Sequence, residues 1–156
     1  MSKHENYVSL EVAKLLKQVG FDWGCPTAWD LTFPNEPYLN YDAIYPVDFR
    51  NNLDDVFYAP TLAVAQKWLR EVKNIEICIH WEIEFEEKEL DWNKRRYCYD
   101  IDTHVDDIPL LSIDDDYWAE GYHTFGNSYS TYEEAQEAGI KKALEMILEK
   151  GEYDRR

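Results

Sequence analysis

The longest regular pattern in the chain is a strict alternation, from Ile75 to Phe85, of apolar residues with polar residues or cysteine. Successive side chains of a β-strand point to opposite faces, so this period of two predicts a long strand with one buried and one exposed face. A second alternation at about 95–103 predicts an antiparallel partner strand, and the polar stretch 86–94 predicts a protruding loop between them. A third strand is expected within 117–125.

Two amphipathic helices are predicted before these strands, because apolar residues there recur every three to four positions. The first covers about 9–19, with Ser9 as its N-cap and Gly20 as the residue that ends it. The second begins after Thr61, which can cap it, and stops before Asn74, a residue that tolerates the left-handed backbone of a helix end. Its predicted apolar face consists of Leu62, Ala65, Leu69 and Val72, with Trp68 on the flank.

A third helix is predicted near the end of the chain. Thr131 and Glu134 have the spacing of a capping box, which marks its first turn. Its last turn is expected at Gly151, and residues 152–156 are expected to fray. One face is apolar and comprises Tyr132, Ala135, Gly139, Ile140, Ala143, Leu144 and Ile147.

The segment 22–59 has no helical spacing, because prolines interrupt it, but its many aromatic residues argue against a free linker. Short extended pieces lying across the core are expected there. The whole chain, 1–156, is therefore predicted to be a single α+β domain: the helix 9–19, this irregular segment, and an α-β-β-β-α unit of about 61–150. The predicted architecture is a three-stranded antiparallel sheet with amphipathic helices on one face.

Composition narrows the possible settings. The chain of 156 residues has 32 Asp and Glu against 16 Lys and Arg, a net charge of −16, and its 15% aromatic content argues against disorder. Such a charge repels phosphate backbones, so direct nucleic-acid binding is not expected. No apolar run reaches the roughly 20 residues of a membrane helix, and the polar residues after Met1 lead us to expect no secretory leader. Together with three widely spaced cysteines, these features predict a reduced, cytoplasmic protein without membrane contact.

The negative charge is concentrated in one quarter of the chain. Residues 82–120 hold 14 acidic and four basic side chains. This distribution favours a carboxylate-rich surface that docks a basic protein and imitates nucleic-acid phosphates. The predicted contact residues are Glu82, Glu84, Glu86, Glu87, Glu89, Asp91, Asp100, Asp102, Asp106, Asp107, Asp114, Asp115 and Asp116, with Trp92, Tyr117 and Trp118 as aromatic anchors. A role of this charge in solubility alone is the competing interpretation.

No catalytic signature stands out, so no catalytic residue and no cofactor is predicted. The glycines form neither a dinucleotide fingerprint nor a P-loop. The helix–three strands–helix order is that of double-stranded-RNA-binding domains, but the last helix opens with Glu133 and Glu134 where that module needs basic residues. The triplet Glu86-Glu87-Lys88 has the form of a metal-dependent nuclease site, yet such triplets arise easily in a glutamate-rich run.

A metal site is a further alternative. Cys78 and His80 share one face of the predicted strand, and Cys98 and Asp100 could join them from its neighbour. Sulfur and imidazole ligands suit Zn²⁺, but the paired C-x₂₋₄-C spacing of structural zinc sites is absent. These residues are therefore weak metal candidates. The aspartate clusters lack the spacing of a calcium-binding EF-hand loop.

The helical segments Tyr7–Phe21, Ala59–Glu71 and Thr131–Leu144 resemble small uncharacterised proteins encoded by phages and prophages of gut bacteria. The resemblance covers the three helices and carries no established activity, so it assigns no site residue. It implies the interior of a host cell, where small acidic phage proteins often bind and inhibit host enzymes. The sequence thus favours a non-enzymatic binding protein, with a solubility role or a metal-dependent enzyme as alternatives.

Overall fold

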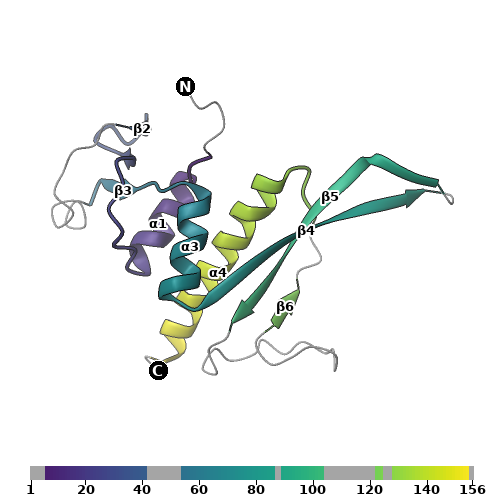
Figure 1. Cartoon of the computed structure of the whole chain (residues 1–156). Coiled ribbons are helices and arrows are strands. Elements are labelled where there is room, and N and C mark those ends of the chain that lie inside the picture. Colours follow the sequence, from purple (N-terminus) through teal and green to yellow (C-terminus); the bar gives the residue numbers. More distant parts are fainter. Residues whose placement is uncertain (1–5, 42–53, 87–88, 104–121, 125–127, 155–156) are drawn as a thin grey trace.

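The fold consists of helices packed on one face of an antiparallel sheet (Figure 1). The computed structural model describes residues 6–41, 54–86, 89–103, 122–124 and 128–154. Its helices are α1 (Leu10–Gln18), α3 (Leu62–Val72) and α4 (Tyr132–Asp154). Both α3 and α4 pack on the sheet, and α1 packs against α4. The predicted α+β class and element order are confirmed.

The main sheet is built on a long hairpin. Its strands are β4 (Ile75–Glu86), β5 (Glu89–Thr103) and β6 (Tyr122–Thr124), all antiparallel in the order β4-β5-β6. The predicted loop over 86–94 is wrong, because strand pairing continues to the pair Glu86–Glu89 after a register shift between Ile83 and Phe85. A ladder satisfies backbone hydrogen bonds whatever the side chains are, so a polar stretch can extend a strand where neither face must be buried.

A second, smaller sheet forms from the proline-rich segment. Its strands are β1 (Ala28–Asp30), β2 (Tyr38–Asn40) and β3 (Val56–Tyr58), in the antiparallel order β2-β1-β3. The buried Asp30 carboxylate accepts hydrogen bonds from the Thr32 backbone and hydroxyl and from the Tyr38 hydroxyl. The bond from the Thr32 hydroxyl is the main reason that the pKa of Asp30 is lowered. The expected short extended pieces are thus confirmed.

The ends of α1 follow the local signals. The Ser9 hydroxyl accepts from the Val12 N–H at 3.3 Å, which caps the first turn. Gly20 adopts a φ of 89°, and its N–H and that of Phe21 donate to the carbonyls of Lys17 and Leu16. This pair of bonds is the Schellman motif, in which a left-handed residue satisfies the last carbonyls of a helix.

The predicted ends of α3 and the first turn of α4 are also confirmed. The Thr61 hydroxyl accepts a hydrogen bond from the Val64 N–H and thereby caps the first turn of α3. At the other end of α3, Asn74 has a left-handed φ of 56°. Thr131 accepts from the Glu134 N–H at 3.1 Å. The predicted end of α4 at Gly151 is wrong, since the helix continues to Asp154. Glycine ends a helix where it takes a positive φ, and Gly151 does not take one.

The core lies between the helices and the first half of the hairpin. A Cβ atom on Gly139 of α4 would lie 2.8 Å from the Ile77 Cγ2 atom and 3.2 Å from the Tyr99 ring, so the helix touches the sheet closely there. Trp68, expected on the flank of α3, is 1% exposed and packs edge-to-face on Phe21. The bulk of its indole fills the space between α3 and the end of α1.

Candidate functional site

The face of the hairpin that points away from the helices is lined by polar and ionisable residues. Side chains alternate between faces, so every second residue of β4 shares this surface with its register partner on β5. The pairs on this face are Glu76–Asp102, Cys78–Asp100, His80–Cys98 and Glu82–Arg96. The sheet therefore brings carboxylates, thiols and an imidazole together at short range.

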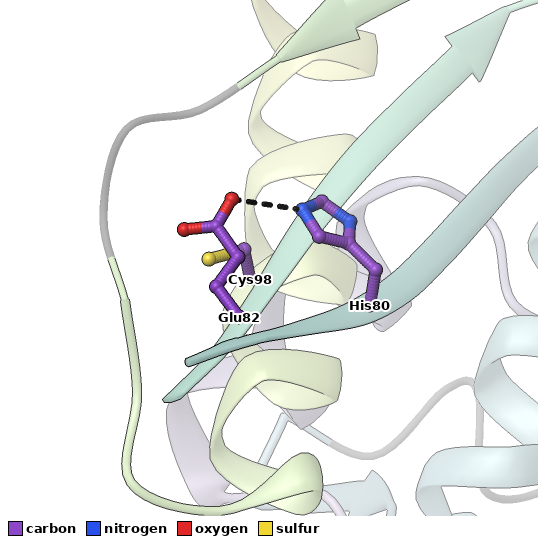
Figure 2. Close-up of side chains that lie close together, drawn as sticks. All are labelled: His80, Glu82 and Cys98. Atoms are coloured by element: carbon purple, nitrogen blue, oxygen red, sulfur yellow. Dashed lines mark ion pairs between the residues drawn. The ribbon is translucent and has the colours of Figure 1, made fainter. Parts of the chain in front are cut away.

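His80 stands at the centre of the closest cluster on this face. Its Nδ1 atom lies 3.2 Å from the Asp100 Oδ2 atom, and its Nε2 atom lies 3.8 Å from the Glu82 Oε1 atom. Figure 2 shows the Glu82 carboxylate and the Cys98 sulfur side by side, with His80 facing them. One nitrogen of His80, one oxygen of Glu82 and the Cys98 sulfur all lie within 4.8 Å of one another.

The cluster has a buried floor and an open side. Cys98 is 7% exposed and Asp100 is 9% exposed, whereas the side chains of His80 and Glu82 are 42% and 66% exposed. The strand ladder holds all four residues at fixed spacings. An ion could therefore enter from solvent and meet ligands whose backbone positions are already set.

The electrostatic field of the cluster is negative. Burial raises the pKa of the Cys98 thiol, and the nearby carboxylates of Glu82 and Asp100 raise this pKa further, against a smaller opposing effect of Arg96. The Arg96 guanidinium itself donates hydrogen bonds to the Ser128 carbonyl and to the hydroxyls of Ser128 and Ser130. Because the Glu82 and Asp100 carboxylates both act on Cys98, a cation placed between His80, Glu82 and Cys98 would be stabilised.

The structure groups the predicted metal candidates differently from the sequence. His80 and Cys98 do lie together, but the third member of the group is Glu82, and the exposed Cys78 is not part of it. The strand register places Cys98 directly opposite His80, whereas Cys78 is opposite Asp100. Period two already put Glu82 on the His80 face, so the signal was present in the sequence, although the register was not.

The structure describes the side chains of only some residues of the predicted acidic surface. Glu82 is exposed, Asp102 is half-buried, and Asp100 is buried beside His80, so Asp100 contributes charge but little contact area. Several predicted contact residues belong to β4 and β5 with side chains outside the described set, namely Glu84, Glu86, Glu89, Asp91 and Trp92. Others lie outside the described residues, namely Glu87, Asp106, Asp107, Asp114, Asp115, Asp116, Tyr117 and Trp118.

Comparison with known proteins adds no relative. No protein-family model, curated protein or solved structure matches the chain significantly. In the part of the chain that the structure describes, no helix is both long and apolar enough to span a membrane.

Proposed function

We propose that this protein is a non-enzymatic binding protein whose β4–β5 hairpin docks a basic surface of a partner protein. The observation that carries the proposal is the shape of the hairpin, whose outer part extends well beyond the helices (Figure 1). A paired two-stranded arm that is not needed to cover the core is available for contact with another molecule.

The helix layer stops part-way along the hairpin. Tyr132, the first residue of α4, packs edge-to-face on Tyr97 with the ring centroids 6.2 Å apart. Tyr97 is the register partner of Trp81, which is 49% exposed although it shares a face with the buried Ile77. The Arg95 guanidinium lies 4.8 Å from the centroid of the Trp81 ring. An exposed tryptophan with a stacked arginine is typical of interface anchors.

Charge favours a basic partner. Residues 75–103, which span the two strands and their connection, contain nine acidic and four basic side chains in a chain whose net charge is −16. Carboxylates spaced along an extended arm steer a positively charged surface toward it and raise the rate of association. An enzyme that processes nucleic acid presents such a surface, since it binds phosphates. Inhibition by occupying that surface is the role that we propose.

The experiment immobilises the protein and identifies the partners that it retains at low salt and at high salt. It compares the wild type with two variants that have equal net charge. The hairpin variant carries Glu84→Gln, Glu86→Gln and Glu89→Gln. The control carries the same three-charge change away from the hairpin, at Glu36, Glu133 and Glu149. We expect wild type and control to retain the same basic partner at low salt, the hairpin variant to lose it, and high salt to release it from all.

Two outcomes contradict the proposal. Equal loss of the partner from both variants would mean that net charge alone attracts it, without a docking arm. Absence of any basic partner at low salt would leave the charge with a role in solubility alone. Circular dichroism of both variants verifies that the fold is intact, so that a lost interaction can be attributed to the removed carboxylates.

A further inference from the structure

We infer that the hairpin also holds a divalent metal site of the zinc class, formed by the His80 imidazole, the Glu82 carboxylate and the Cys98 sulfur, whose thiol proton is released to solvent when the metal binds. The inference goes beyond the proposed docking function and does not depend on it. It concerns the register pairs His80–Cys98 and Glu82–Arg96, on either side of the pair Trp81–Tyr97, whereas the docking test changes Glu84, Glu86 and Glu89 farther out.

The donor set fits zinc. Imidazole nitrogen, thiolate sulfur and carboxylate oxygen are the three kinds of ligand that Zn²⁺ takes in proteins. Bond lengths of about 2.0–2.3 Å in a tetrahedral site put ligand atoms about 3.3–3.8 Å from one another. The His80–Glu82 pair is already at 3.8 Å, and the whole group lies within 4.8 Å. The remaining distance is to the Cys98 sulfur, and rotation of the partly exposed His80 and Glu82 side chains can close it while the strands stay in place.

The ladder supplies the rigidity that a metal site needs. His80 and Cys98 are directly opposite each other on paired strands, and Glu82 follows His80 on the same face. Opposite residues of an antiparallel pair have Cβ atoms only about 4.5–5.5 Å apart. Short side chains on such a pair therefore reach a common ion without any movement of the backbone.

Asp100 positions the imidazole. Its carboxylate lies 3.2 Å from the His80 Nδ1 atom, and its side chain is 13% exposed. When the Nδ1–H group donates a hydrogen bond to this carboxylate, Nε2 carries the free lone pair on the side of Glu82. Metal-binding histidines are commonly oriented by such a hydrogen bond. Three protein ligands leave a fourth position for water, on the side where His80 and Glu82 face solvent.

The test measures zinc binding by the purified full-length protein, first stripped of metal, in competition with a chromophoric chelator. We expect one Zn²⁺ per chain. His80→Gln and Cys98→Ser should each weaken binding by more than about 100-fold, and Asp100→Asn by about 10–100-fold, as for other residues that orient a ligand. Matched controls on the same face, Cys78→Ser and Glu76→Gln, should bind as wild type does.

Cobalt gives a second readout that reports the sulfur directly. The Co²⁺-loaded protein should show a thiolate charge-transfer band that Cys98→Ser removes and Cys78→Ser retains. Failure of wild type to bind a single zinc ion, or a band that follows Cys78, would overturn the inference. His80 is partly exposed, so His80→Gln should keep the fold; unchanged zinc affinity in this variant would also overturn it. Every substitution made here leaves Glu84, Glu86 and Glu89 intact, so loss of zinc and loss of docking are measured separately.

Discussion

The inner and outer halves of the β4–β5 hairpin have different surroundings, although one alternating pattern runs along β4 through both. In the inner half, Ile75 and Ile77 are 1% and 2% exposed beneath α3 and α4. Farther along the same face, Trp81 is 49% exposed, and the Arg95 guanidinium lies 4.8 Å from the centroid of its ring. Alternation therefore identifies a strand with two unlike faces, but a packed neighbour decides whether the apolar face is buried.

The largest expected contrast between the halves comes from shortening one apolar side chain in each. Ile77→Ala should lower the free energy of unfolding by about 2–5 kcal/mol, because it removes a buried side chain and leaves a cavity against α4. Trp81→Ala should lower it by at most about 1 kcal/mol, since the residue is half exposed. Urea denaturation measures both. Equal losses would mean that the outer half is as tightly packed as the inner half.

The burial of Tyr99 in the inner half can be tested through the dependence of stability on pH. It is 4% exposed, and burial raises its pKa to about 12 from the ordinary 10.0. The unfolded chain thus loses this proton near pH 10 while the folded protein keeps it, so stability falls as the pH rises from 10 toward 12. The two-unit shift corresponds to about 2–3 kcal/mol at full ionisation.

Tyr99→Phe removes this titration and should flatten that part of the profile of urea midpoint against pH. Tyr97→Phe, at the start of the outer half, is the matched control and should follow wild type. A Tyr99→Phe profile that falls as steeply as wild type between pH 10 and 12 would show that Tyr99 does not account for the loss.

A substitution at Gly139 tests how closely α4 packs against the inner half of the hairpin. Gly139→Ala places a methyl group 2.8 Å from the Ile77 Cγ2 atom. Overpacking costs about 1–3 kcal/mol, against a gain in helix propensity of about 1 kcal/mol, so a net loss of up to about 2 kcal/mol is expected. Gly151→Ala, with nothing within 4 Å of the added atom, should stabilise by up to about 1 kcal/mol. Thermal unfolding distinguishes the two signs, and a stabilised Gly139→Ala protein would contradict the close contact.

Helix ends were predictable because their signals are local. Ser9, Thr61 and Thr131 cap the helices that the spacing predicts, and Gly20 and Asn74 end two of them with left-handed backbones. Each of these motifs involves hydrogen bonds between residues only a few positions apart, so nothing distant can change them much. The same local rule failed at Gly151, where the continuing helix needs no left-handed residue.

Features that depend on distant partners could not be predicted in this way. Pairing of β1 with both β2 and β3, and of β4 with β5 up to Glu86–Glu89, depends on backbone hydrogen bonds that do not require a particular side chain. Only part of the candidate metal cluster could be predicted, because the rest depends on strand register. His80 and Glu82 share a face by period two, but only the register brings Cys98 opposite His80.

By itself, the sequence determined the class of the fold, the starts of its helices, the two faces of the long strand and the strongly negative charge. These properties follow from local backbone preferences, from the periods of helix and strand, and from composition. The tertiary structure decided how far the hairpin extends, where the helix layer stops covering it, and which ionisable side chains meet at His80. Those properties depend on strand register and on contacts between residues far apart in the chain, which no local pattern specifies.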